Sequence, residues 1–274
     1  MKQILLVIGL VAVVGCGEKK VSPEPHSHAP VTPKTEPEEE TENPQSAPAP
    51  VVIVTIADPI VEKAIRKSLK KPTGKLTKAD LAKVKGLSFR FNQLTNVKGL
   101  EKLTQLEVLN LSSNQLTDLK GLEKLTQLKT LIIDASKLTD VKVKGLEKLT
   151  QLTYLRLAVN QLTDVKGLEK LTQLTELGLY RNKLTDVKGL EKLTRLKVLE
   201  LYQNKLTNVK GLEKLTQLTY LNLAVNQLTD VKGLEKLTRL KVLELEDNPD
   251  LTKAQIDQLQ KALPKCKITS NPTN

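Results

Sequence analysis

The chain has 274 residues, a formal net charge of +12 and only 2% aromatic residues, with no tryptophan. This composition excludes an ordinary globular core, because nearly all of the core volume must come from leucine, valine and isoleucine. Leucine recurs at fixed intervals through most of the chain, which predicts a repeat array. The lysines are spread over this array, so we interpret their charge as a solvated face and expect no nucleic acid partner.

The first 15 residues have the features of a secretion signal. Lys2 precedes an apolar run, residues 4–14, that is too short to span a bilayer. The run ends in Val-Val-Gly-Cys, with the cysteine at position 16, and this motif resembles the lipobox of bacterial lipoproteins. The resemblance implies that Cys16 is lipidated and becomes the mature N-terminus. The chain would then be anchored to a bacterial membrane in the cell envelope, facing the periplasm or the exterior.

A tether follows the lipidated cysteine, so that residues 16–50 form one segment. The stretch is rich in proline, glutamate, serine and threonine and has almost no large apolar residue. Such a composition cannot bury enough surface to offset the entropy of ordering, so we expect disorder. His26 and His28 lie in this stretch without a third ligand. We therefore predict no metal site, and nothing else in the chain indicates a cofactor.

A 22-residue unit fills residues 84–249. Its apolar and asparagine positions resemble the leucine-rich repeat, L-x-x-L-x-L-x-x-N-x-L. Eight copies begin at Val84, Leu106, Leu128, Leu152, Leu174, Leu196, Leu218 and Leu240. The third copy departs from the pattern, because Ser136 stands where the others have asparagine and residues 141–144 include two extra residues. We interpret this insertion as a local bulge on the back of the coil.

The spacing inside one copy predicts two kinds of local structure. Leu109 and Leu111 alternate with polar residues, as in a strand with one buried face. The later leucines recur every three residues, which fits a 3-10 turn or an irregular arc better than an α-helix. Together with the resemblance, this gives an α/β solenoid: a right-handed coil with a parallel β-sheet on the concave face, a 3-10 or irregular convex side, and helical caps at both ends.

The caps are predicted from residues 51–83 and 250–274. In the first, Asp58-Pro59 starts a helix that Pro72 and Gly74 should stop, and Thr77 starts a second helix. This segment and the repeat length resemble the internalin-type proteins of bacteria. In the second cap, Thr252 to Gln255 is a capping box that opens a helix, followed by a strand at Cys266. We interpret the Cys266 thiol as a small buried apolar side chain.

Function is expected on the outward positions of the strands. The back of the repeat is nearly the same in each copy, whereas these positions vary and hold all four tyrosines. Tyrosine and arginine are enriched at binding hot spots, although tyrosine also suits exposed strands and recent duplication leaves scattered differences. We predict a monomeric module that binds a protein partner through ten residues: Tyr154, Arg156, Glu176, Tyr180, Arg181, Glu200, Tyr202, Tyr220, Asn222 and Glu244.

Two alternative classes of function would use other features of the chain. An enzyme is not expected, because the facing carboxylates Glu176 and Glu200 would lie on an open sheet without a water-excluding pocket. A structural envelope component would instead use its convex side to contact an anionic polymer. That side carries Lys98, Lys120, Lys166, Lys188, Lys210 and Lys232. A glutamate follows three residues after each of these lysines and should neutralise much of the charge.

Overall fold

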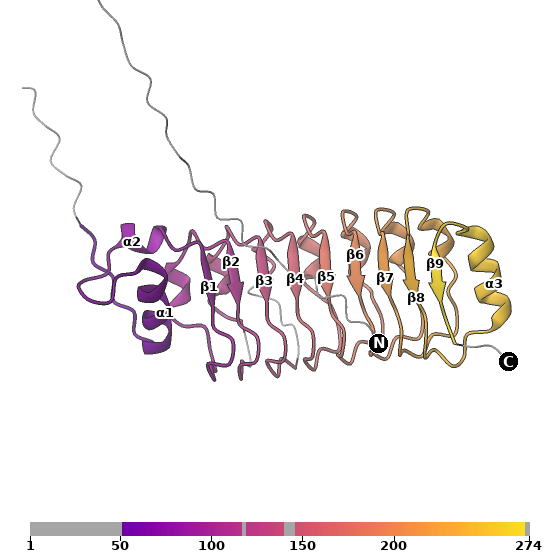
Figure 1. Ribbon diagram of the computed structural model, residues 1–274, viewed down its shortest axis with the longest axis horizontal. Helices are drawn as coiled ribbons and strands as arrows, with labels where there is room; N and C mark the ends of the chain where they lie inside the picture. Colours follow the sequence, from indigo (N-terminus) through magenta and orange to yellow (C-terminus); the bar gives the residue numbers. More distant parts are fainter. Residues whose placement is uncertain (1–50, 117–118, 140–145, 272–274) are drawn as a thin grey trace, which may run out of the picture. The chain divides into compact units, whose positions relative to one another are not determined.

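The computed structural model describes residues 51–116, 119–139 and 146–271. The predicted signal, the lipidated Cys16, the tether and the insertion of the third repeat lie outside the described residues. The described part of the chain belongs to one compact unit, residues 49–274 (Figure 1).

One parallel sheet runs the length of this unit. Strands that are neighbours in sequence are also neighbours in the sheet, and each pairs with the next in a register that aligns equivalent repeat positions, such as Leu109 with Leu131. In the described residues the strands are β1 (Gly86–Ser88), β2 (Val108–Asn110), β3 (Thr130–Ile132), β4 (Tyr154–Arg156), β5 (Glu176–Gly178), β6 (Val198–Glu200), β7 (Tyr220–Asn222), β8 (Val242–Glu244) and β9 (Lys267–Thr269).

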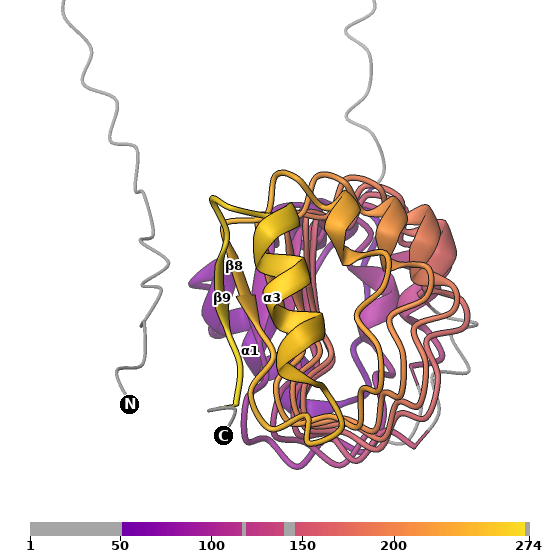
Figure 2. The same cartoon turned by 90° about the vertical axis from the view of Figure 1, so that its right-hand side faces the viewer.

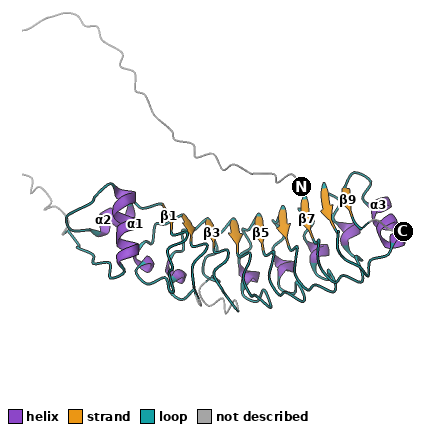
Figure 3. Ribbon diagram, turned by 60° about the horizontal axis from the view of Figure 1, so that its bottom comes forward, coloured by secondary structure: helices purple, strands orange, loops and turns teal. Residues whose placement is uncertain are grey.

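The coil places the sheet on one side and short helical turns on the other. Figure 2 looks along the coil and shows the strands and the turns as opposite walls. Figure 3 shows the strands on the inner side of the arc formed by the repeats. The 3-10 turns are η1 (Leu100–Lys102), η2 (Leu122–Lys124), η3 (Leu168–Lys170), η4 (Leu190–Lys192), η5 (Leu212–Lys214) and η6 (Leu234–Lys236). The predicted solenoid, with its concave sheet and 3-10 back, is confirmed.

Leucine fills the space between the two walls. Leu155, Leu177 and Leu199, at the centres of successive strands, are at most 1% exposed, and the leucines of the back are at most 8% exposed. Burying one such side chain contributes roughly 1.5–3 kcal/mol. Ordering a 22-residue coil costs more than its own leucines return, so neighbouring coils must stack to be stable.

An asparagine ladder closes the turn after most of the strands. The Nδ2 group of Asn204 donates to the carbonyls of Leu179, Leu201 and Tyr202, and its Oδ1 atom accepts from the Leu184 amide. The buried backbone groups of two coils are thereby satisfied by one side chain. In the third repeat the Ser136 hydroxyl takes part of this role by donating to the carbonyls of Leu111 and Asp134.

The back of each repeat has a glycine and a glutamate that act together. Gly211 precedes η5 with a φ of 103°, a conformation that residues with a side chain rarely adopt. Its N–H donates to the Glu213 carboxylate at 2.6 Å, and the equivalent bond recurs in front of η1, η2, η3, η4 and η6. The glutamates predicted to neutralise the lysines therefore also close the turns that build the back.

The N-terminal cap contains α1 (Pro59–Leu69) and α2 (Lys78–Ala82). The Asp58 carboxylate accepts from two amides at the start of α1, as predicted. The predicted stop at Pro72 and Gly74 was placed too late. The helix ends at Leu69 because Lys70 adopts the left-handed conformation, with φ 53°, and the Lys71 amide closes back on Arg66.

The C-terminal cap contains α3 (Lys253–Ala262), which covers the end of the coil (Figure 2). The predicted capping box is present, since the Thr252 and Gln255 side chains each accept from the other's backbone N–H. The predicted strand position was slightly wrong, because β9 starts at Lys267 and Cys266 lies just before it. The Cys266 side chain is buried, as predicted, and this burial raises the pKa of its thiol.

Candidate binding surface on the inner face of the sheet

Three positions of each repeat point away from the leucine core: the first and last residues of the strand and the residue two places after it. We call the surface they form the inner face. In the repeat that contains β5, these residues are Glu176, Gly178 and Tyr180. They align with Val198, Glu200 and Tyr202 of the next repeat. All four tyrosines of the chain are partly exposed on this face, and none enters the core.

Arg156 organises the N-terminal part of this surface. Its guanidinium pairs with the Asp134 carboxylate at 2.7 Å, donates to the Tyr180 hydroxyl and lies 5.5 Å from the centre of the Tyr180 ring. Burial acts to lower the pKa of Arg156, but Asp134 and the neighbouring tyrosines outweigh it and raise that pKa. Burial also raises the pKa of Asp134 despite its ion pair. Arg156 is thus a fixed cation whose charge is already matched within the protein.

Two tyrosines form a stacked pair beside this ion pair. The rings of Tyr180 and Tyr202 have centres 4.6 Å apart and planes 10° from parallel. They come from equivalent positions of adjacent repeats, so the spacing of the parallel strands holds them in this arrangement. Burial raises the pKa of Tyr180 to about 12, which keeps its hydroxyl protonated and able to donate.

A second hydrogen-bonded group lies further along the face, on β7 and β8. The Tyr220 hydroxyl donates to the Glu244 carboxylate at 3.0 Å, and the Asn222 amide donates to the same carboxylate. Burial raises the pKa of Tyr220 to about 12. All donors to Glu244 in this group are neutral, so its negative charge is not compensated by them.

A small hollow of about 20 Å³ lies beside Arg156 on the same face. Gly178 lines it, and the residues around it include Tyr154, Glu176 and Glu200. A side chain at Gly178 would fill it, because a Cβ atom there would lie 3.1 Å from Arg156 Cγ and 3.3 Å from Glu200 Oε2. The space is enough for roughly one water molecule or the tip of one side chain.

The structure therefore brings together most of the predicted site residues. Arg181 is the exception: it lies at the rim, exposed, with its Nε donating to the Gln203 side chain at 2.8 Å. Sequence reasoning missed Asp134 and Gly178. Asp134 occupies the same repeat position as Tyr180 and Tyr202, so the register alone could have found it. The hollow beside Gly178 depends on the directions of the neighbouring side chains, which no pattern in the sequence shows.

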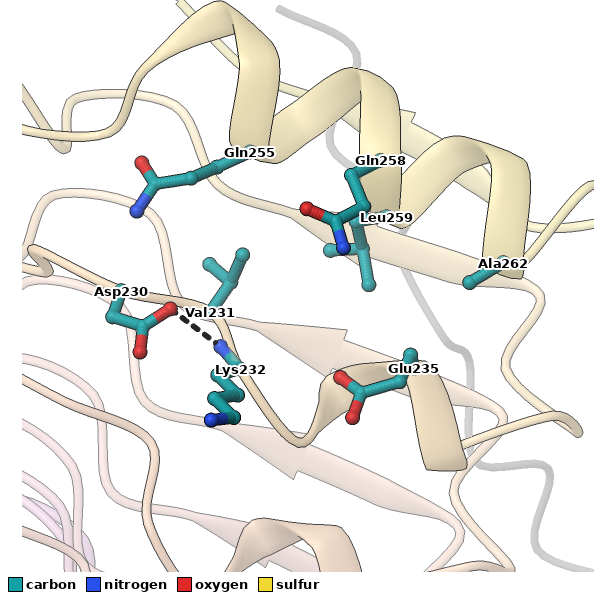
Figure 4. A pocket seen from close by; sticks show the side chains of 8 residues that line it. All are labelled: Asp230, Val231, Lys232, Glu235, Gln255, Gln258, Leu259 and Ala262. Atoms are coloured by element: carbon teal, nitrogen blue, oxygen red, sulfur yellow. Dashed lines mark hydrogen bonds between the residues drawn. The ribbon is translucent and has the colours of Figure 1, made fainter.

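Other hollows lie on the back of the coil and at its end. An open groove of about 430 Å³ separates α3 from the last turns (Figure 4). Gln255, Gln258, Leu259 and Ala262 face Asp230, Lys232 and Glu235 across it, and the Lys232 amide donates to Asp230 at 2.8 Å. Its charges come from the turn motif that every repeat shares, so we assign it no specific role.

The lysines of the convex side are exposed in a column, as predicted, with Lys166, Lys188, Lys210 and Lys232 in equivalent positions. Among the residues described by the structure, no group of three or more histidine, cysteine, aspartate or glutamate side chains is placed to hold a metal ion. In the same residues, every helix is too short or too polar to cross a lipid bilayer.

Comparison with known families identifies the repeats. The family described as Leucine Rich repeats (2 copies) matches at residues 83–124, 104–148, 150–192, 172–214, 194–230 and 216–261. These matches cover more than half of the chain, so the chain belongs to the leucine-rich-repeat family. Proteins of this family generally act as protein–protein interaction modules, and solenoids of this kind bind through extended concave surfaces.

Two solved structures show the same fold. Internalin C2 of Listeria monocytogenes shares 28% identity, covers 82% of this chain and 99% of its own, and superposes with a TM-score of 0.73. A leucine-rich-repeat protein of Leptospira interrogans shares 34% identity, covers 69% of this chain and 50% of its own, and gives a TM-score of 0.66. Comparison with curated protein sequences found no match. The predicted internalin-like fold is confirmed.

Proposed function

We propose that this chain is a monomeric binding module of the bacterial cell envelope that contacts a protein partner through its inner face. One observation supports this most strongly: the residues that differ between repeats gather on that face, where Arg156, Tyr180 and Tyr202 form a contiguous, partly exposed group. Aromatic rings and arginine bring large contact area and polar handles together, which is the composition of binding hot spots. In this proposal the chain has no catalytic role.

The attachment to the envelope rests on the N-terminal sequence. We propose that residues 1–15 are removed, that Cys16 carries the lipid anchor, and that residues 17–50 act as a tether. The caps at 51–83 and 250–274 would then enclose the repeats of 84–249. Growth of bacteria expressing the chain with an alkyne-tagged fatty acid should label the wild type, whereas Cys16→Ser should remain unlabelled. Labelling of both would contradict the anchor.

The partner-binding face can be tested without knowing the partner. The tagged, lipidated chain is crosslinked in intact envelopes and recovered, and the yield of the crosslinked protein is compared between variants. Tyr154→Ala with Tyr220→Ala should lower that yield about tenfold, since two hot-spot side chains are lost. Lys188→Ala with Lys210→Ala, on the convex side, is the matched control and should leave it unchanged. Equal yields from the wild type and the tyrosine variant would contradict the proposal.

A second candidate function uses the convex side, where the exposed lysine column favours contact with an anionic polymer. This contact would depend on charge alone, so it should weaken steeply as the salt concentration rises. A contact centred on tyrosine should weaken much less. Binding to immobilised polyphosphate that is lost between low and physiological salt, and lost in the lysine control variant, would favour this candidate.

A further inference from the structure

The inner face is not uniform in charge. At the outward positions of β5 to β8 there are four glutamates and no lysine or arginine: Glu176, Glu200, Glu244 and Glu246 are interspersed with Tyr180, Tyr202, Tyr220, Asn222 and smaller residues. This occurs in a chain whose net charge is +12. The rims of the face carry exposed cations, among them Lys197 and Arg181, so the negative charge is confined to the centre.

No cation in the part of the chain that the structure describes pairs with the carboxylates of Glu176, Glu200 or Glu244. Among the described residues, the side chains of Glu176 and Glu200 make no hydrogen bond or ion pair, and Glu244 accepts only from neutral groups. The nearest cation of the face, Arg156, is held by Asp134. Burial raises the pKa of Glu200, with Arg156 only partly opposing it. A carboxylate in this situation gains from any cation that a partner brings close.

The tyrosines add a second feature suited to a cation. Glu200 and Tyr202 lie two residues apart on the same face of one repeat, and Tyr202 stacks on Tyr180 of the preceding repeat. A guanidinium or ammonium group is attracted to the face of an aromatic ring as well as to a carboxylate. The ring pair already receives one such contact, from Arg156, which lies 5.5 Å from the centre of the Tyr180 ring.

We propose that the inner face of β5–β8 binds a basic segment of the partner protein, one that carries lysine or arginine side chains. This inference rests on the proposed function and specifies its partner. The four strands span roughly 14 Å, since parallel strands lie about 4.8 Å apart, which is the length of about four extended residues. Glu200 and Glu244 share the last strand position and Glu176 lies at the first position of β5. A short segment with one or two cations therefore matches the distance that these three carboxylates cover.

The positive net charge of the chain would by itself favour the opposite kind of ligand. Non-specific attraction to a protein of charge +12 would favour acidic ligands. At physiological salt, charges more than about 8 Å away are largely screened, so only the local carboxylates should act on a bound cation. Preference for a basic ligand over an acidic one would thus have to arise from a local group of carboxylates, and substitution of the inner-face glutamates tests whether it is this one.

The test uses the full-length chain in a neutral detergent and two fluorescein-labelled 12-residue peptides, one of alternating arginine and serine, the other of alternating glutamate and serine. Fluorescence anisotropy at 0.15 M salt should show that the arginine peptide binds more tightly. Glu176→Gln with Glu200→Gln should weaken its binding about 3- to 10-fold, because two ion pairs are lost. Asp250→Asn with Asp257→Asn removes two exposed carboxylates outside the inner face and is the charge-matched control, expected to change nothing.

Three results would overturn the proposal. The glutamate peptide could bind as tightly as the arginine peptide, or the double glutamine variant could bind like the wild type. The chain could also self-associate through this face, which sedimentation would show as dimers and larger assemblies that the glutamine variant does not form. In that case the occupant would be the lysine-rich back of a second copy. If these peptides fail while envelope capture still depends on Tyr154 and Tyr220, the proposed function stands and only the basic partner is excluded.

Discussion

The Asp134 carboxylate joins the third repeat to the fourth, because it pairs with the Arg156 guanidinium at 2.7 Å and accepts from the Ala158 amide at 3.0 Å. The third repeat has no ladder asparagine, since Ser136 stands in that place. An ion pair on the inner face thus links the two coils at the point where the buried ladder is altered.

Removing this carboxylate should be costly. Asp134→Ala would leave a partly buried arginine without its partner and an amide without its acceptor, so we expect a loss of about 1–3 kcal/mol in the free energy of unfolding. Urea denaturation followed by circular dichroism would measure it. Asp257→Ala, which breaks the exposed pair between Lys253 and Asp257 at 3.5 Å, should cost less than about 0.5 kcal/mol. Similar losses in both variants would show that the ion pair of the inner face contributes no more to the free energy of unfolding than an exposed pair does.

The ladder asparagines should matter more than asparagines on the surface of the back. Asn204→Ala removes donors to the carbonyls of Leu179 and Leu201 and the acceptor of the Leu184 amide, all of them buried. We expect a loss of about 2–4 kcal/mol, because these backbone groups cannot reach water. Asn208→Ala is the control, since Asn208 is exposed, accepts from the Lys210 amide and donates only to the exposed Thr207 hydroxyl at 3.4 Å. It should cost at most about 1 kcal/mol.

Two glycine substitutions should separate stability from binding. Gly211→Ala forces a side chain into a backbone with φ 103°, so it should destabilise the fold by about 1–3 kcal/mol. Gly178 has no such constraint, and the atoms nearest to an added Cβ are Arg156 Cγ at 3.1 Å and Glu200 Oε2 at 3.3 Å, so both side chains need to move only slightly. Gly178→Ala should therefore leave the melting temperature nearly unchanged but weaken partner capture. A large loss of stability in Gly178→Ala would mean that the hollow is part of the packing.

The pH dependence of stability should have a contribution from Asp80 at the N-terminal cap. The Lys71 ammonium and the Thr77 backbone and hydroxyl donors lower the pKa of Asp80 from 3.8 to about 2. A lowered folded-state pKa stabilises the fold above the unfolded value, and this stabilisation is lost as the pH falls from about 4 to about 2. The melting temperature of the wild type should exceed that of Asp80→Asn at neutral pH, and the difference should shrink over that range. A difference that is constant from pH 7 to pH 2 would contradict this assignment.

Much of the fold could be predicted because the repeat imposes it. The alternation around Leu109 and the spacing of three along the back each specify one wall of the coil, and the 22-residue period specifies the register. Helix starts were also readable, since Asp58 and Thr252 are capping residues whose bonds are local. The end of α1 could not be predicted, because any residue that tolerates the left-handed conformation can end a helix. Here Lys70 adopts that conformation.

The candidate site was only partly predictable. The outward positions of the tyrosines follow from strand alternation, but the contacts among them do not. Two features depend on side-chain directions and on competition between neighbours: Arg156 turns toward Asp134 and Tyr180, and Glu200 makes no hydrogen bond or ion pair with another described residue. The contacts of the back could not be predicted either: the glutamates there accept hydrogen bonds from glycine amides such as that of Gly211.

The most direct test of the inner face is site-specific photo-crosslinking in intact envelopes. A photoreactive amino acid would replace Val198, which lies beside Glu200 on the inner face, or Lys188 on the convex side. We predict a discrete crosslinked product from position 198 that is lost when Tyr154→Ala and Tyr220→Ala are added, and no such product from position 188. A product from position 188 alone, or equal products from both positions, would contradict the assignment of binding to the sheet.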